Sequence, residues 1–73
     1  MGKFLYISFF TTAEAMETEV VMQELGLSGK LVPVPRAISA GCGISWRTED
    51  LDREKIEKIL LENEIEWEEL TIL

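Results

Sequence analysis

The run FLYISFF at residues 4–10 is apolar almost throughout and is rich in aromatic and branched side chains. Such a run is typical of a strand that lies centrally in a sheet. Successive side chains of a strand alternate between its two faces, so Leu5, Ile7 and Phe9 share one face without a polar atom. We expect this face to pack against helices, because the opposite face carries hydroxyl groups.

A helix is predicted directly after this run. The sequence Thr-Thr-Ala-Glu that begins at Thr11 fits a capping box, in which the side chains of Thr11 and Glu14 accept hydrogen bonds from each other's backbone amides. Gly26 is well placed to end the helix in the left-handed conformation. Met16 and Val20, four residues apart among glutamates, would form a second apolar ridge that faces outward. The inward arc at helical spacing consists of Ala15, Thr18, Val21, Met22 and Leu25.

Three further strands are predicted. Residues 30–35 (KLVPVP) are extended, and their two prolines lack amide donors, which confines this strand to an edge of the sheet. After a loop, residues 42–47 (CGISWR) form a third strand. Residues 65–73 (IEWEELTIL) close the chain as a charged strand. Its alternation slips at Glu68 and Glu69, so we expect a β-bulge there.

A second helix is predicted between the third and fourth strands. Either Thr48 or Asp50 is its expected N-cap, and acidic residues occupy its first turn, where they complement the helix dipole. Asn63 is expected to end this helix. The inward stripe consists of Ile56, Ile59, Leu60 and Asn63.

The order strand, helix, strand, strand, helix, strand predicts an α+β fold of the ferredoxin-like βαββαβ type. In this plan a four-stranded antiparallel sheet carries two helices on one face, with strands one and three central and strands two and four at the edges. The apolar first strand, the proline-bearing second and the glutamate-rich fourth agree with those positions. Residues 1–73 are expected to form a single domain with a small core.

Composition restricts the classes of function. Fourteen acidic and seven basic side chains give a formal net charge of -7, which would repel the phosphate backbone of a nucleic acid. A single cysteine cannot form a disulfide within the chain, so a reducing compartment is expected. No apolar run approaches the roughly 20 residues of a membrane span, and the first residues lead into a strand without a cleavable signal. We therefore expect a cytoplasmic domain that binds neither nucleic acid nor membranes.

The cysteine lies in the segment PVPRAISAGCGISWR, which also holds both prolines and two of the seven basic residues. Cys42 stands between Gly41 and Gly43, which let the backbone turn tightly and bring amides close to the sulfur. Arg36 and Arg47 could add positive charge, and both influences favour the reactive thiolate. The chain has no histidine, so it lacks the Cys-His couple that hydrolysis of the protease kind requires.

Two interpretations of Cys42 stay open. Free cysteine is often a small buried hydrophobe, in which case Cys42 is a packing residue. Cys42 and Arg47 are five residues apart and would point to opposite faces of a regular strand. They can meet only if Gly43 carries a bulge or if Cys42 still belongs to the loop. Trp46 shares the face of Cys42 and either walls the thiol or packs in the sheet.

Metal and cofactor chemistry has little support. One cysteine and no histidine cannot form a structural zinc site within one chain, and the carboxylates lack the spacing of a calcium loop. The many glutamates are better explained as a solvated acidic face. We expect no metal and no cofactor.

The cysteine segment also matches the signature of a known family. The sequence resembles a small bacterial family of selenium/sulfur carrier-like proteins, formerly a domain of unknown function, and the resemblance covers nearly the whole chain. Glu64 departs from the family, which has glycine after Asn63, and Trp46 stands where smaller residues are usual. The matching residues of the segment are Pro33, Pro35, Arg36, Ile38, Ser39, Cys42, Gly43 and Arg47.

The resemblance implies that Cys42 carries sulfur or selenium, as a persulfide or selenopersulfide, between a donor and an acceptor protein. A cysteine desulfurase or a selenophosphate-producing enzyme would be such a partner, and the protein would be a carrier rather than a true enzyme. A carrier needs one accessible thiol and no second cysteine that would resolve its persulfide, and this chain has a single cysteine. The residues expected to stabilise the anionic sulfur are Arg36, Arg47, Gly41, Gly43 and Ser39.

Two other functions remain as alternatives. In the first, residues 36–47 bind a small anion or an acidic segment of a partner, and Cys42 is a packing residue. In the second, the protein is a structural domain that forms a homodimer through the open face of its sheet.

Overall fold

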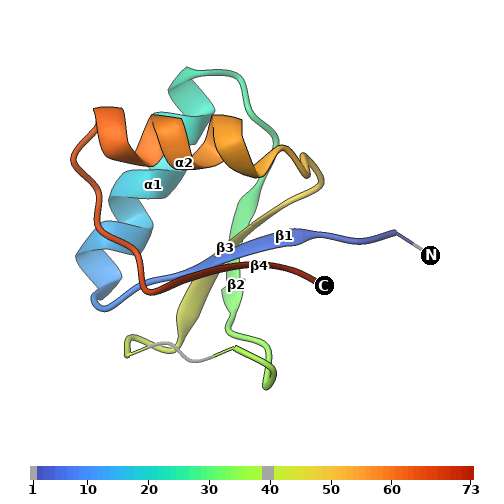
Figure 1. Cartoon of the computed structure of the whole chain (residues 1–73). Helices are drawn as coiled ribbons and strands as arrows, with labels where there is room; N and C mark the ends of the chain where they lie inside the picture. Colours follow the sequence, from blue (N-terminus) through green and yellow to red (C-terminus); the bar gives the residue numbers. More distant parts are fainter. Residues whose placement is uncertain (1, 39–40) are drawn as a thin grey trace.

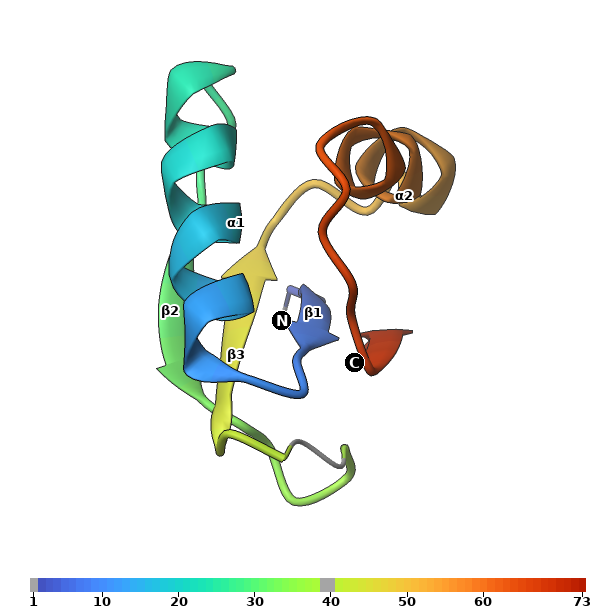
Figure 2. The ribbon, with the colours of Figure 1, turned by 90° about the vertical axis from the view of Figure 1, so that its left-hand side faces the viewer.

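The structure is a computed structural model, and it describes residues 2–38 and 41–73. The sheet is antiparallel throughout, and its strand order is β2-β3-β1-β4. Figure 2 shows α1 beside β2 and β3, with α2 on the same face of the sheet. This is the predicted ferredoxin-like α+β fold, with β1 and β3 central. In chain order the elements are β1 (Leu5–Ser8), α1 (Thr12–Glu24), β2 (Lys30–Pro33), β3 (Ile44–Thr48), α2 (Arg53–Glu62) and β4 (Glu69–Ile72) (Figure 1).

The core lies between the sheet and the helices. Ile7 on β1 is directly opposite Trp46 on β3 and Leu70 on β4, and all three are buried. Burial of Leu5, Ile7 and Phe9 confirms the predicted helix-facing side of β1. The helices complete the cluster, whose buried members are Leu5, Ile7, Phe9, Ala15, Met22, Trp46, Ile56, Leu60, Ile65 and Leu70.

Helix α1 begins with the predicted capping box. The Thr11 hydroxyl accepts from the Glu14 amide at 3.3 Å, and the Glu14 carboxylate accepts from the Thr11 amide at 3.2 Å. At the other end Gly26 has φ +76°, and the Leu27 amide donates to the Met22 carbonyl oxygen at 2.9 Å. These bonds make a Schellman motif, in which a left-handed residue follows the helix.

The burial of α1 matches the predicted inward arc except at its end. Ala15, Thr18 and Met22 are fully buried, but Leu25 is 57% exposed, so its assignment to the core was wrong. Leu25 is the C-cap residue, which follows the last helical residue Glu24. The predicted outward ridge is confirmed, because Met16 and Val20 are more than half exposed.

Helix α2 starts later than the sequence predicted. Its N-cap is Asp52, whose carboxylate accepts from the Lys55 amide at 3.2 Å, so the expectation of Thr48 or Asp50 was wrong. Thr48 is still part of β3, and its hydroxyl donates to the Ser28 carbonyl oxygen at 2.6 Å. Asp50 instead forms an ion pair with Lys55 and accepts from the Asp52 amide.

The end of α2 repeats the geometry of the end of α1 with a different residue. Asn63 is the C-cap, as predicted, although its side chain is exposed rather than part of the inward stripe. The Ile65 amide donates to the Leu60 carbonyl oxygen at 2.9 Å, which is again the Schellman pattern. The left-handed position is occupied by Glu64, with φ 56°. Glu64 therefore holds a conformation that glycine adopts at no steric cost.

The strands are shorter than the apolar runs that predicted them. β3 begins at Ile44, so Cys42 lies in the preceding loop, and β4 begins only at Glu69. Glu69 is the register partner of Ser8, and the amide of Glu68 donates to the carbonyl oxygen of Ser8 at 2.7 Å. Glu68, which directly precedes β4, and Glu69 thus both meet Ser8, which is the two-against-one contact of the predicted β-bulge.

Candidate functional site

The cysteine loop, which we define as residues 34–43, joins β2 to β3. Val34 extends the pairing of these strands, because its amide donates to the Gly43 carbonyl oxygen at 3.1 Å. A turn follows, in which the Ile38 amide donates to the Pro35 carbonyl oxygen at 3.0 Å. Ile38 is only 6% exposed, so the loop is anchored by an apolar side chain. In Figure 2 the loop extends beneath β1 towards β4.

Cys42 is a free, half-buried thiol at the start of the approach to β3. Its Sγ donates to the Ile44 carbonyl oxygen at 3.3 Å, and its side chain packs against the hydrophobic core cluster. Gly43 has φ +76°, a left-handed conformation that a residue with a Cβ rarely adopts. The backbone therefore turns at Gly43, and Cys42 combines features of both interpretations, since it is partly exposed and partly packed.

Gly41 connects the cysteine loop to the opposite edge of the sheet. Its amide donates to a carboxylate oxygen of Glu68 at 3.0 Å. A Cβ at Gly41 would lie 3.0 Å from the Phe10 carbonyl oxygen, so the loop passes very close to the end of β1. The Gly41 amide is thus engaged by a carboxylate, which would have to release it before the amide could bind an anionic sulfur. The sequence did not predict this contact of Glu68 with the cysteine loop. The only sequence signal at Glu68 was the slip in the alternation of the fourth strand.

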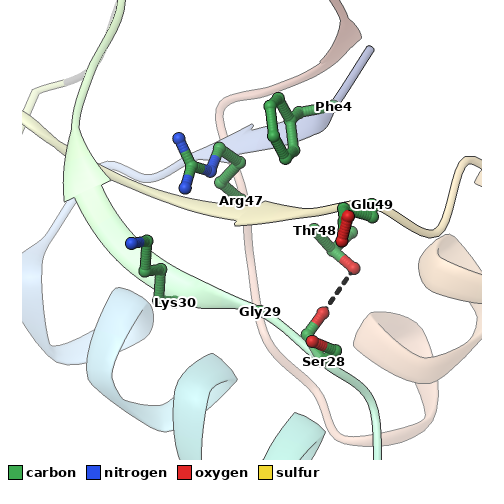
Figure 3. Close-up of a pocket in the computed structure, with 7 residues that line it drawn as sticks. All are labelled: Phe4, Ser28, Gly29, Lys30, Arg47, Thr48 and Glu49. Carbon is green, nitrogen blue, oxygen red and sulfur yellow. Dashed lines mark hydrogen bonds between the residues drawn. The ribbon is translucent and has the colours of Figure 1, made fainter. Parts of the chain in front are cut away.

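Arg47 lies on the open face of the sheet, the face away from the helices. Its guanidinium carbon is 4.3 Å from the centre of the Phe4 ring, a cation-π contact. Lys30 is its cross-strand partner on β2 (Figure 3). The two cations border a cavity of about 220 Å³ that is also lined by Phe4, Ser28, Gly29, Thr48 and Glu49. Sequence reasoning missed Lys30, because only strand register reveals its pairing with Arg47.

The predicted site residues therefore fall into separate places. Gly41, Cys42 and Gly43 are consecutive in the loop, and Arg36 is exposed in the turn of the same loop. Arg47 is not brought to the thiol, because Cys42 packs against the core whereas Arg47 stacks on Phe4 on the open face. The turn at Gly43 does not bring the side chains of Cys42 and Arg47 to the same face of the sheet. Ser39 lies outside the described residues.

The described residues offer little to other chemistry. Within residues 2–38 and 41–73, no group of three His, Cys, Asp or Glu side chains could hold a metal ion. Neither helix of this part of the chain has the length and apolar character needed to cross a membrane.

Comparison with known protein families gives a match over most of the chain. The model of the family described as "Putative Se/S carrier protein-like" matches residues 4–71. The chain belongs to this family. The match includes all six elements of the fold except the last residue of β4, and it includes the whole cysteine loop. Comparisons with curated proteins and with solved structures gave no match.

Proposed function

We propose that the protein carries sulfur or selenium on Cys42, as a persulfide or selenopersulfide, between a donor and an acceptor protein. The observation that carries this proposal is a free, half-buried thiol in a glycine-framed loop of a Se/S carrier family member. The chain has no second cysteine, so a persulfide formed on Cys42 has no internal thiol that would discharge it as a disulfide.

The transfer step is an exchange between sulfur atoms. The Cys42 thiolate attacks the terminal sulfur of a persulfide on the donor, a new S–S bond forms on Cys42, and the S–S bond of the donor breaks. The donor leaves as a thiolate, so the step needs no external oxidant or reductant. A cysteine desulfurase is a donor of this chemical class, and a selenophosphate-producing enzyme is a candidate acceptor of selenium.

The contacts of the loop indicate what must change during transfer. The bond from the Cys42 Sγ to the Ile44 carbonyl oxygen uses the thiol proton, so it is lost when the thiolate forms. Arg36 is exposed on the same loop and is the cation better placed to meet an anionic sulfur, whereas Arg47 has Phe4 as a partner. In this proposal Gly41 and Gly43 shape the loop.

A second candidate function is the binding of a small anion without covalent chemistry. The paired cations Lys30 and Arg47 favour it, because they border one cavity and like charges directly opposite each other on a sheet are destabilising, a cost that a bound anion would reduce. This function would leave Cys42 as a packing residue. It predicts that the protein gains no sulfur under any loading condition.

Sulfur loading tests the proposal. The reduced protein is incubated with a cysteine desulfurase and cysteine, and its intact mass is measured before and after treatment with a reducing agent. We expect the mass of one or more added sulfur atoms, all removed by reduction, and no gain for Cys42→Ala. Wild type that gains no sulfur, or Cys42→Ala that gains as much as wild type, would contradict the carrier function.

A further inference from the structure

A small apolar hollow lies beside the cysteine loop. It has a volume of about 280 Å³ and is lined by Phe10, Leu61, Ile65, Glu66 and Trp67. Ile65 is buried, whereas Phe10 is 54% exposed and Leu61 is 67% exposed. Two large apolar side chains from distant parts of the chain thus meet in solvent around one depression. Such convergence is typical of an interaction site rather than of scattered surface residues.

The hollow adjoins the residue that precedes Cys42. Gly41 approaches the backbone of Phe10, which forms one wall, and its amide is bound by Glu68, which follows the wall residue Trp67. A partner seated in the hollow would therefore lie next to the cysteine loop.

Charge around the hollow selects the kind of partner. Residues 59–73 contain five glutamates and no lysine or arginine, although the chain has seven basic residues in all. The glutamates of this segment are Glu62, Glu64, Glu66, Glu68 and Glu69. Four of the five lining residues, Glu66 among them, belong to this acidic segment, whose glutamates we call the acidic rim. An apolar hollow in an acidic segment complements an apolar anchor flanked by basic residues.

The backbone at Glu64 adds a second argument for the acidic rim. Glu64 holds a left-handed φ of 56° in the turn between the wall residues Leu61 and Ile65. The corresponding position after α1 is occupied by Gly26, which needs no such strain. Backbone strain of this kind is concentrated at functional sites. A residue that bears a carboxylate thus occupies a position beside the hollow that glycine would fit at lower conformational cost.

We propose that the hollow binds one large apolar side chain in a basic segment of the protein that exchanges sulfur with Cys42. The volume suits a single side chain rather than a cofactor, since sites for small molecules are usually larger. A second copy of the chain is a poor occupant, because both surfaces would carry the same acidic rim. This inference rests on the proposed function for the identity of the partner, and on the hollow itself for the chemistry of recognition.

Nuclear magnetic resonance titration tests the hollow. The probe is a short synthetic peptide with a central phenylalanine flanked by lysines, and the matched control peptide has glutamates in place of the lysines. We expect the lysine peptide to shift the signals of Phe10, Leu61 and Trp67, and the glutamate peptide to shift none. Because the rim contributes through charge, binding of the lysine peptide should weaken as salt is added.

Two variants localise the binding. Leu61→Gln should weaken binding of the lysine peptide by about tenfold or more, because it places a polar amide in the apolar wall without adding charge. Met16→Gln is the matched control, because Met16 is 56% exposed on the outer ridge of α1, and this variant should leave binding unchanged. Both sites are exposed, so both variants should fold.

The outcomes distinguish this inference from the carrier function. Equal binding of both peptides, no binding of either, or shifts centred on Met16 would overturn the docking proposal. None of these results depends on the thiol, whereas sulfur loading depends on it and uses no peptide. If the protein gains sulfur but binds no peptide, the carrier function holds and the docking site is wrong. If it binds the lysine peptide but gains no sulfur, the docking site holds and the carrier function is wrong.

Discussion

Glu64 and Gly26 occupy equivalent positions at the ends of the two helices, and the comparison isolates the effect of one residue. Both have positive φ, and both ends have the hydrogen bonds of a Schellman motif. A Cβ at Gly26 would meet no atom within 4 Å, so backbone conformation rather than crowding decides which residue fits there. A side chain in the left-handed region costs roughly 1–2 kcal/mol, which Glu64 bears and Gly26 avoids.

We expect Glu64→Gly to raise the free energy of unfolding by about 0.5–1 kcal/mol, because relief of the left-handed strain exceeds the added entropy of glycine in the unfolded chain. Gly26→Ala, the reciprocal control, should lower it by about 1 kcal/mol. Urea denaturation of the two variants and wild type measures both changes. A loss of stability in Glu64→Gly would mean that the carboxylate makes a stabilising contact that outweighs the strain.

Residue identity predicted much of the candidate site but not its geometry. The lone thiol, its two glycines and the left-handed Gly26 follow from residue type, since each type has a restricted chemistry or conformation. The spacing of Cys42 and Arg47 predicted opposite faces for a regular strand, but it left open whether the backbone at Gly43 or a loop position of Cys42 would bring them together. The hydrogen bond between Glu68 and Gly41 was not predicted, because the two residues are 27 positions apart in the sequence.

The start of α2 shows how an element boundary depends on competing hydrogen bonds. Asp50 and Asp52 are both good N-cap types, and only Asp52 caps the helix. Asp50 is held in the preceding turn by Lys55 and by the Asp52 amide. The hydrogen bond from the Lys55 ammonium and the bond from the Asp52 amide hold the pKa of Asp50 below its ordinary value of 3.8.

These two aspartates should respond differently to substitution. We expect Asp52→Ala to lower the free energy of unfolding by about 1 kcal/mol through loss of the cap. Asp50→Asn should lower it by less than about 1 kcal/mol, because the ion pair is largely exposed to solvent. Thermal unfolding at neutral pH would rank the variants, and an Asp50→Asn loss larger than that of Asp52→Ala would contradict the assignment of the cap.

The effect of Asp50 should also depend on pH in a defined direction. Its folded pKa is depressed, so its contribution is present above the unfolded pKa and is lost as the pH falls through the folded value. The difference between wild type and Asp50→Asn should therefore disappear in acid below the ordinary value of 3.8. A difference that grows as the pH falls would contradict this sign.

Element types were predictable where a period or a special residue defined them. The capping box at Thr11, the proline-marked edge strand and the bulge at Glu68 all rest on local rules. Boundaries were less predictable, since β1 and β4 are shorter than their apolar runs and pairing partners rather than hydrophobicity decide where a strand ends.

At the scale of the whole molecule, charge and size act together. The net charge is -7, and the principal dimensions are 29 × 28 × 17 Å. The Debye length is about 30 Å at 0.01 M salt and about 8 Å at 0.15 M. At low salt the Debye length is about as long as the molecule, so every carboxylate interacts with every other and their repulsion destabilises the compact state.

We expect the unfolding temperature to rise as sodium chloride is increased from about 0.01 M to about 0.15 M, because screening weakens this repulsion. Relief of about 1 kcal/mol would correspond to a rise of about 4–8 °C for a domain of this size. The control is the double variant Glu62→Gln with Glu66→Gln, which should show a smaller rise. Its net charge is -5, from -7 plus the two carboxylates removed. An unfolding temperature that falls with salt would contradict the repulsion argument.

The overall fold was predictable because independent signals agreed on one topology. The apolar first strand, the prolines of the second and the glutamates of the fourth each assign a strand to the centre or the edge of the sheet, and the observed order satisfies all three. Such agreement between local and global preferences is what a foldable sequence requires. Partner surfaces could not be predicted in the same way, because the hollow is formed by Phe10 and Leu61, which only the folded chain brings together.

The two tryptophans differ in environment, and this gives the protein a built-in optical readout. Trp46 is 1% exposed in the core, where a Cβ on Gly29 would collide with its ring, whereas Trp67 is half-buried in the wall of the hollow. Emission from Trp46 should report on the integrity of the fold, and quenching of Trp67 by a soluble quencher should report on occupancy of the hollow. A single fluorescence experiment on the unlabelled protein would thus report separately on folding, through Trp46, and on docking, through Trp67.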